Sequence, residues 1–350
     1  MQSMIIGPNQ AGQRLDKFLH KCLPMAGTGF LYKMLRKKNI TLNGKKAEGS
    51  ELLLQGDQVC FFFSADTFAK FSGQTGDMRL MDKMLSEYRT AYQELNNINV
   101  VYEDEHILIL DKPAGILTQK AAPGDLSLNE WMIGYLFSRN PGFEKELSGF
   151  HPSVCNRLDR NTSGLVLCGK TLPGLQYLSR CIKERKIRKF YRTICLGQLR
   201  EGSHIKGYLV KDQKENKVRV ETGESSAADT FIEAGESGTV KGSYIETAYK
   251  PIRVGEDFTL LEVELITGKT HQIRAHLAGI GHPLIGDFKY GDRQSNRIIQ
   301  ERYGLQYQLL HAFQVIFPES SESAGMAVSG KSFTADCPVL FKRLQSGLGL

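Results

Sequence analysis

A single carboxylate, Asp159, stands between two arginines in the segment Asn156-Arg-Leu-Asp-Arg-Asn-Thr-Ser-Gly164. A neighbouring guanidinium favours the ionised form of a carboxylate. The small polar residues Thr162 and Ser163 can bond the backbone of a turn and so fix where the aspartate points. This arrangement can hold an ionised aspartate ready for chemistry. A surface ion pair in a loop is the simpler interpretation, and the tripeptide alone does not exclude it, because Arg14-Leu15-Asp16 repeats it near the N-terminus.

Longer motifs accompany this segment in a defined order along the chain. They are Asp111-Lys-Pro-Ala-Gly115, Lys189-Phe-Tyr191 with Gly197, Leu265 to His276, Gly281 to Asp287 with Tyr290-Gly291, and Leu310-His-Ala312. Together with the Asp159 segment, they resemble the RluA family of pseudouridine synthases over roughly residues 98 to 345. Two positions depart from that family: Asn156 stands where many members have His, and Lys269 where many have Arg.

The resemblance implies an isomerase whose nucleophile is Asp159. Pseudouridine formation detaches uracil from its ribose, turns the base and rejoins it through carbon, so nothing is oxidised and no cofactor is expected. Arg274 would pair with Asp159, since an arginine fork can bind and orient a carboxylate. Tyr191 offers an aromatic face for the uracil and a hydroxyl for a late proton transfer. The alternatives are an arginine on a strand paired elsewhere and a tyrosine packed in the core. Attack on the base and action at the sugar both stay open.

A uridine in folded RNA must leave its stack to reach such a site, which costs a few kcal/mol. Binding energy elsewhere has to offset that cost. In the catalytic part we expect RNA or substrate contacts from Arg157, Arg160, Thr162, Lys189, Thr270, His271 and Gln272. A basic cluster is a further candidate for phosphate contacts, with a solvated helix face as the alternative. This cluster consists of Arg180, Lys183, Arg185, Lys186, Arg188, Lys189 and Arg192.

Positive charge is concentrated at the N-terminus, where residues 1–64 contain nine Lys or Arg and four Asp or Glu. Apolar residues at helical spacing predict short helices over 14–23 and around 30–35. A strand over 40–42 then leads into an Asn43-Gly44 turn, and another strand covers 59–63. This pattern resembles the S4 RNA-binding domain, although packing against the main domain is an alternative role. The RNA contacts expected from this domain are Lys33, Arg36, Lys37, Lys38 and Lys45.

These patterns predict an α+β protein with three parts. A small α/β S4-like domain covers residues 1–64, a linker with an amphipathic helix covers 65–97, and the catalytic domain covers 98–350. After residue 98, short apolar runs alternate with turns and a few helices. A mixed, mostly antiparallel sheet with flanking helices is therefore expected for the catalytic domain.

The remaining composition narrows the class of protein. Seven cysteines without a CxxC pair predict thiols in a reducing compartment. His271, His276 and His282 lack the HExxH spacing, so no metal is expected. No apolar run approaches the roughly 18 residues that span a bilayer, and no signal sequence precedes the first helix. We expect a cytoplasmic monomer that binds RNA and no membrane.

Several functions fit these observations. The leading one is isomerisation of specific uridines in 23S ribosomal RNA, free or in ribosome assembly intermediates, because an S4 domain joined to an RluA-like domain is typical of such enzymes. Transfer RNA is the nearest alternative substrate. A protein that keeps the fold but only binds RNA or assists ribosome assembly is an alternative of another class. An aspartyl phosphotransferase would require Mg²⁺ and a second acidic residue, and the segment 156–170 provides none besides Asp159.

Overall fold

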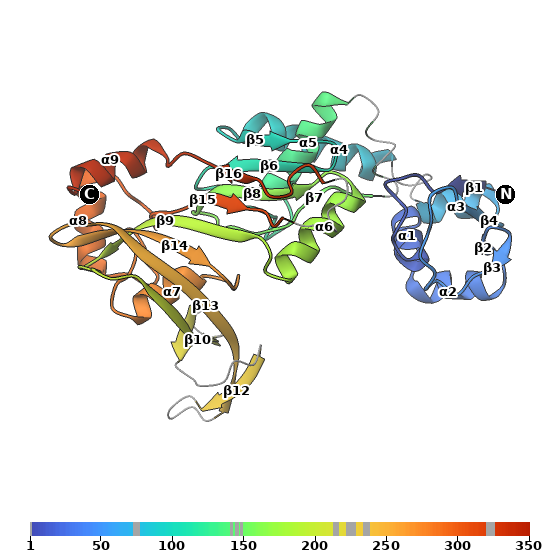
Figure 1. The fold of residues 1–350 in the computed structure, drawn as a ribbon. Helices are drawn as coiled ribbons and strands as arrows, with labels where there is room; N and C mark the ends of the chain where they lie inside the picture. Colours follow the sequence, from blue (N-terminus) through green and yellow to red (C-terminus); the bar gives the residue numbers. More distant parts are fainter. Residues whose placement is uncertain are drawn as a thin grey trace.

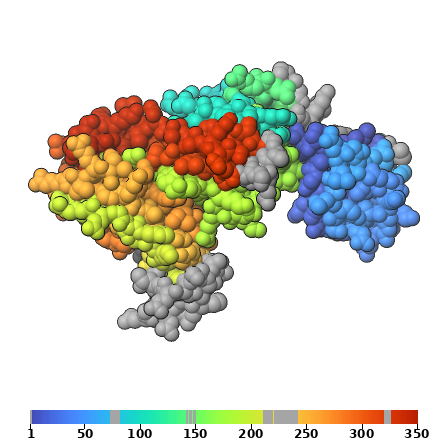
Figure 2. Space-filling model, viewed as in Figure 1, coloured from blue at the N-terminus to red at the C-terminus, as the bar shows by residue number. Residues whose placement is uncertain are grey.

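The computed structural model describes residues 2–72, 78–140, 143, 147, 150–212, 217–221, 229–233, 239–319 and 326–350. These residues form an α+β fold, as expected, with a small four-stranded sheet near the N-terminus and a large sheet that carries the other described strands (Figure 1). The N-terminal unit is a lobe at one end of the molecule, and the C-terminal helix lies at the opposite end (Figure 2).

The N-terminal unit contains the two expected helices and the expected turn. Its elements are β1 (Gln2–Ile5), α1 (Leu15–Cys22), α2 (Thr28–Arg36), β2 (Ile40–Leu42), β3 (Lys45–Lys46), β4 (Gln58–Phe61) and α3 (Ala65–Ser72). The strands pair in the order β1-β4-β2-β3. Asn43 and Gly44 join β2 to β3 with φ of 52° and 72°, the double left-handed conformation of a tight hairpin turn. The patterns in the sequence did not predict β1 or α3.

The core of this unit is formed by one face of each helix and by the inner side of the sheet. Leu15, Phe18 and Leu19 of α1 are fully buried in it, as their helical spacing predicted. Phe68 of α3 belongs to the same core, so the packing of the unit continues past residue 64. The unit touches the rest of the chain where Gln176 Nε2 donates to the Gly12 carbonyl oxygen at 3.1 Å.

The predicted linker helix is α4 (Met78–Glu94), and it packs against the following domain. Tyr88 and Ala91 of this helix are buried in the same core as Trp131 and Met132 of α5 (Leu128–Arg139). An ion pair of 2.7 Å between Lys120 and Glu87 adds to this contact. The helix is therefore a structural part of the catalytic half of the chain.

The large sheet has twelve strands in the described residues. Its main path runs β11-β10-β13-β14-β9-β15-β8-β6-β5, with β12 beside β13, β16 beside β15 and β7 beside β8. The strands are β5 (Asn99–Glu103), β6 (Ile107–Lys112), β7 (Ser153–Val154), β8 (Ser163–Gly169), β9 (Arg188–Leu196), β10 (Ser203–Asp212), β11 (Lys217–Glu221), β12 (Asp229–Glu233), β13 (Thr239–Val254), β14 (Phe258–Leu265), β15 (Leu310–Ile316) and β16 (Ser332–Thr334). The pair β8–β15 is parallel and the other strand pairs of this sheet in the described residues are antiparallel, which agrees with a mixed, mostly antiparallel sheet.

Helices cover both faces of the sheet near β6 and β8. Alternate residues of these strands face opposite sides: Leu108 and Val166 pack in the core with α5, whereas Ile107 and Leu165 pack with α6 (Leu172–Lys183). Burial on both sides explains why these strands read as continuous apolar runs in the sequence.

Three further helices complete the catalytic half: α7 (Gln272–Gly279), α8 (Arg293–Tyr303) and α9 (Val339–Gly347). The side chain of Asp292 caps the start of α8 by accepting from Ser295 N at 2.7 Å, and Gly304 ends the helix in the left-handed conformation. Across the described part of the chain, we find no helix with the length and apolar character required to cross a membrane.

Candidate active site

Asp159 lies in a loop, residues 156–162, that leads into β8 and rests on the segment 113–118 that follows β6. Thr118 holds this loop just before the aspartate. Its Oγ1 donates to the Leu158 carbonyl oxygen at 2.8 Å and accepts from Leu158 N at 3.2 Å. The motif at residues 111–115 therefore leads into a segment that supports the Asp159 loop; we call this segment, residues 113–118, the cradle.

Lys112, the last residue of β6, also holds this loop through hydrogen bonds. Its side chain is fully buried, and Nζ donates to the carbonyl oxygens of Pro113, Ile116 and Arg160 at 3.0, 2.9 and 3.1 Å. Gly115 N also donates to the Arg160 carbonyl oxygen at 2.9 Å, and Arg160 Nε returns a bond to Gly115 at 3.1 Å. Burial lowers the pKa of the Lys112 ammonium to about 7. The buried Lys112 amine thus connects the cradle to the Asp159 loop.

Asn156 anchors the other end of the loop to β8. Its Oδ1 accepts from Leu167 N at 2.7 Å, and its Nδ2 donates to the Leu165 carbonyl oxygen at 3.4 Å. Asn156, at the position where many family members have His, therefore holds the loop through the backbone of β8.

Gly164 lets the loop enter the sheet beside β15. Its φ is 112°, and a Cβ atom there would lie 2.2 Å from the Ala312 carbonyl oxygen. A side chain fits neither the backbone conformation nor the space. The glycine that opens the apolar run is therefore required by the close parallel pairing of β8 and β15.

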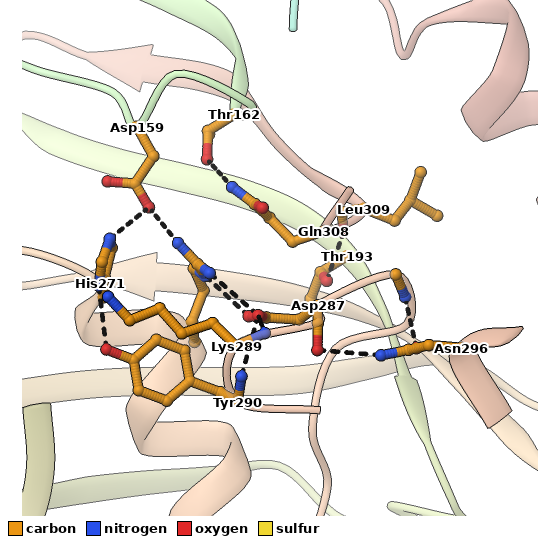
Figure 3. Close-up of polar contacts among 12 residues, drawn as sticks. Asp159, Thr162, Thr193, His271, Asp287, Lys289, Tyr290, Asn296, Gln308 and Leu309 are labelled. Atoms are coloured by element: carbon orange, nitrogen blue, oxygen red, sulfur yellow. Dashed lines mark hydrogen bonds and ion pairs between the residues drawn. The ribbon is translucent and has the colours of Figure 1, made fainter. Parts of the chain in front are cut away.

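Arg274 on α7 binds two carboxylates at once, those of Asp159 and Asp287, which are both labelled in Figure 3. Its Nη1 donates to Asp159 Oδ2 at 2.9 Å. Its Nε and Nη2 donate to Asp287 Oδ2 and Oδ1 at 2.7 and 2.9 Å. The predicted pairing of Arg274 with Asp159 is present, but the bidentate partner of the guanidinium is Asp287.

Asp287 is almost completely buried and held by its surroundings. Its Oδ1 also accepts from the backbone nitrogens of Lys289 and Tyr290 at 3.0 and 3.1 Å, and its carbonyl oxygen accepts from Asn296 Nδ2 at 2.9 Å. Burial raises the pKa of this carboxyl, but the hydrogen bonds and charge of Arg274 outweigh burial and keep the pKa below its ordinary value. Asp287 is thus an ionised anchor that fixes the guanidinium.

His271 precedes α7 and faces the same carboxylate. It has the left-handed conformation, with φ of 57°. Its Nδ1 shares a hydrogen bond of 3.0 Å with the Tyr290 hydroxyl, and its Nε2 lies 3.8 Å from Asp159 Oδ2. Burial lowers the pKa of His271, against the opposing effect of Asp159. The imidazole is therefore mostly neutral at pH 7.

A cleft of about 500 Å³ opens beside Asp159. Tyr191 on β9 forms part of its wall and is nearly buried, with 5% of its surface exposed. Burial raises the pKa of the Tyr191 hydroxyl far above its ordinary value, so the phenol keeps its proton. The other residues around this cleft include Leu117, Thr118, Cys155, Asn156, Arg157, Leu158, Ile182, Lys189, Leu265, Lys269, Thr270 and His271. The cleft thus combines one carboxylate, an aromatic wall and basic side chains.

Two residues expected to contact RNA are buried and bonded within the protein. The Gln272 amide accepts from Thr267 Oγ1 at 2.7 Å and donates to Glu246 O and Thr247 Oγ1, both at 2.9 Å. Thr162 is also buried, and its Oγ1 accepts from the amide of Gln308 at 3.4 Å. Their hydrogen bonds support the site from within, and both residues also line the small pocket at Asp159, so contact with RNA or substrate stays a prediction for them.

The other expected contacts are accessible. Arg157, Arg160 and Thr270 are exposed near Asp159, and Lys189 is half-buried in the cleft, where burial lowers its pKa. The five basic residues expected to bind RNA in the N-terminal unit are exposed: Lys33, Arg36, Lys37, Lys38 and Lys45.

The basic cluster at 180–192 is partly neutralised by acidic neighbours. Arg188 binds Glu264 through two hydrogen bonds of 2.8 and 3.0 Å across the β9–β14 pair. Arg192 binds Glu262 at 3.0 Å on the same pair. Only part of this cluster therefore presents unpaired charge toward a phosphate backbone.

The patterns in the sequence missed three residues that build the site: Lys112, Asp287 and Tyr290. In the sequence, Asp287 follows Gly286, and an aspartate beside a glycine is typical of a turn. Lys112 follows an apolar strand, and a lysine that ends a buried strand is a signal for a buried ammonium. Metal ligation is not indicated in the described residues, which contain no cluster of three His, Cys, Asp or Glu suited to an ion.

Comparison with known proteins gives a matching family, relatives of similar sequence and solved structures of similar fold. Residues 106–279 match the family described as RNA pseudouridylate synthase. The ribosomal large subunit pseudouridine synthase C of Vibrio parahaemolyticus is 28% identical over 330 residues, which cover 94% of this chain and 92% of that protein. The protein of the same name from Rickettsia bellii is 29% identical over 315 residues, which cover 89% and 92%. The solved structure of human RNA pseudouridylate synthase domain containing 4 has a similar fold, with a TM-score of 0.53 and 18% identity over 77% of this chain and 97% of that one.

Proposed function

The chain carries a pseudouridine synthase domain of the RluA family, and we propose that this isomerase acts on uridines of large-subunit ribosomal RNA with Asp159 as its nucleophile. One observation carries the role of Asp159: it is the carboxylate at the cleft that a fixed arginine holds, with Arg274 Nη1 2.9 Å from Oδ2. A fixed, ionised carboxylate needs little reorganisation when it attacks.

The two oxygens of Asp159 have different roles. Oδ2 is the oxygen near both Arg274 and His271, at 2.9 and 3.8 Å. Within the described residues, Oδ1 accepts no hydrogen bond, and it is the oxygen that attacks the nucleoside. Attack on the base and action at the sugar both use this oxygen, and Arg274 stabilises the carboxylate again when it leaves.

The cleft holds the detached uracil during its rotation. Breaking the bond between N1 and C1′ leaves a base that must turn until C5 faces C1′ without escaping. Tyr191 and Leu265 provide flat and apolar walls for this turn. The base in the cleft covers Asp159, whose side chain is 26% exposed, and so limits the access of water to the intermediate.

Entry to this cleft requires the uridine to be flipped out of its RNA. Unstacking costs a few kcal/mol per base, so uridines in loops and weak junctions are favoured. The exposed basic residues of the N-terminal unit and of the Asp159 loop supply phosphate contacts that offset this cost. Large-subunit ribosomal RNA is the proposed substrate because two relatives that match about nine tenths of the chain carry that substrate in their names. Transfer RNA is the second candidate.

The nucleophile is tested by Asp159→Asn, with Asp336→Asn, at a fully exposed aspartate, as the control. RNA from cells that lack this protein serves as substrate. We expect pseudouridine formation to fall on the order of 10⁴-fold or more with RNA affinity retained, while the control keeps full activity. Unchanged modification by Asp159→Asn would refute the role of Asp159. Mapping pseudouridines in ribosomal and transfer RNA, with and without the protein, decides the substrate.

A further inference from the structure

We propose that His271 is the proton carrier of the reaction, taking the proton from C5 of the uracil at Nε2 and delivering a proton to N1. This inference rests on the proposed function, since it assigns a second group of the same site to a later step. It is carried by the position of the imidazole, which stands between the Asp159 carboxylate and the Tyr290 hydroxyl (Figure 3).

The isomerisation itself requires a proton carrier. When the bond from C5 to C1′ has formed, C5 still holds its hydrogen, and N1 is joined to C6 by a double bond. Loss of the C5 proton lets the electrons of that C–H bond form the C5–C6 double bond. The electrons of the C6–N1 double bond then move to N1, which takes up a proton. One proton leaves, one arrives, and no oxidant or reductant is involved.

The geometry gives His271 access to this chemistry. His271 lines both the small pocket at Asp159 and the wider cleft beside it, and its side chain is about one fifth exposed. Nδ1 is engaged by the Tyr290 hydroxyl at 3.0 Å and Nε2 lies 3.8 Å from Asp159 Oδ2, so Nε2 is the nitrogen placed to meet a nucleoside bound at Asp159. The rings of Tyr290 and His271 also pack in a T-shaped arrangement, with ring centroids 5.6 Å apart and planes at 69°. Tyr290 thus fixes the orientation of the His271 imidazole.

The Tyr290 hydroxyl allows the imidazole to change its protonation without moving. A hydroxyl can accept from Nδ1–H or donate to an unprotonated Nδ1. When it accepts, Nε2 carries the lone pair that receives the C5 proton. The imidazolium so formed then gives a proton from Nε2 to N1, which restores the neutral ring.

Other polar groups around the carboxylate are less suited to this step. Arg274 stays protonated and is bonded to Asp159 and Asp287. Tyr191 keeps its proton because burial raises its pKa, and a neutral phenol is a weak base. The charges that act on His271 are Asp159 and Asp287, which favour its protonated form, and Arg274 and Lys289, which oppose it. Burial lowers the pKa of His271 further, in the same direction as Arg274 and Lys289, so the imidazole enters the reaction neutral.

The test replaces His271 with Asn. Asparagine tolerates the left-handed backbone conformation at this position and can still contact Tyr290, but it has no basic nitrogen. His204→Asn, at an exposed histidine on β10, is the control. The measurements are the rate of pseudouridine formation and the isotope effect when the substrate RNA carries deuterium at C5 of uridine. RNA affinity and the urea midpoint show whether binding and folding are retained.

We expect His271→Asn to slow turnover about 100-fold and to increase the C5 isotope effect above that of the wild type and of the control. Tyr290→Phe, which removes only a hydroxyl, should increase the isotope effect by a smaller amount. A slow variant whose isotope effect equals that of the wild type would show a positioning role and overturn the proposal. Full activity of His271→Asn would overturn it as well. Wild-type protein that formed no pseudouridine in any RNA would instead refute the proposed function.

Discussion

Asp287 binds Arg274 through two hydrogen bonds of 2.7 and 2.9 Å, and both side chains are more than nine tenths buried. The pair lies behind the cleft, so its contribution to catalysis is to fix the guanidinium that holds Asp159. A buried ion pair of this kind is costly to break, because the remaining charge stays desolvated.

Replacing Asp287 with Asn should therefore harm both stability and turnover. We expect a loss of about 3–5 kcal/mol in the free energy of unfolding, measured with urea. Displacement of Arg274 by about 1 Å would lower kcat on the order of 100-fold. Asp336→Asn removes a surface pair of 3.5 Å and should change either quantity little. Equal effects of the two substitutions would show that Arg274 does not depend on Asp287.

Lys112→Met should loosen the Asp159 loop. The carbonyl oxygens of Pro113 and Ile116 lose this donor, whereas that of Arg160 keeps its bond from Gly115 N; an unsatisfied buried group costs about 1–3 kcal/mol. We expect kcat to fall at least about tenfold while RNA affinity is largely retained. Lys342→Met, at an exposed lysine, is the control. Full activity of Lys112→Met would mean that the other bonds of the cradle suffice.

The lowered pKa of Lys112 predicts that the stability of the wild type, compared with that of Lys112→Met, depends on pH. The pKa of Lys112 is about 7 in the folded chain because of burial, although Asp159 and Asp111 oppose the shift. An unfolded lysine titrates near 10.4. Between these values the unfolded chain holds more protons, so this group makes the folded state more stable as pH rises. The stability of the wild type relative to Lys112→Met should increase from pH 7 to pH 10, and a constant or falling difference would contradict the lowered pKa.

Gly164→Ala should disrupt the pairing of β8 with β15. The added Cβ would lie 2.2 Å from the Ala312 carbonyl oxygen, in addition to the strain of a φ of 112°. Gly281 is a matched control, since its φ is 85° but a Cβ there meets nothing within 4 Å. We expect Gly281→Ala to cost about 1–2 kcal/mol and Gly164→Ala clearly more in urea unfolding. Similar losses would mean that the sheet yields easily at this point.

Neutralising the basic residues of the N-terminal unit should weaken RNA binding and its dependence on salt. The five substitutions to Gln are at Lys33, Arg36, Lys37, Lys38 and Lys45. If each contacts a phosphate, the slope of log affinity against log salt should decrease by up to about 3.5, at roughly 0.7 per contact. A control variant carries Gln at Arg293, Arg297, Arg302 and Lys342 on α8 and α9. A slope that changed equally in both variants would assign no special role to the N-terminal unit.

Patterns in the sequence predicted those parts of the fold that depend on residues close together in the sequence. The Asn43-Gly44 turn and helices α1 and α2 follow from turn chemistry and apolar periodicity. The pairing of Asp159 with Arg274 was anticipated only because both residues belong to motifs of a known family. Spacing alone does not bring residues 115 positions apart into contact.

The parts that were not predicted depend on the register of distant strands. Arg188 and Arg192 look like free cations in the sequence, yet the β9–β14 pairing places Glu264 and Glu262 beside them. Asp287 looks like a turn residue until α7 places Arg274 against it. Pairing across a sheet, which residue order does not encode locally, decides which charges remain available.

The position of β15 between β8 and β9 also affects how this protein matures during synthesis. Residues 310–316 are added late, after the segments that carry the reactive aspartate and the aromatic wall. Until they emerge and insert, the two neighbouring strands have open edges and the loop before β8 lacks its parallel partner. A truncated chain that ended before β15 would leave unpaired backbone N–H and C=O groups on β8 and β9, which favour aggregation. We therefore expect that only a chain extending through residue 316 can complete the sheet and the active site.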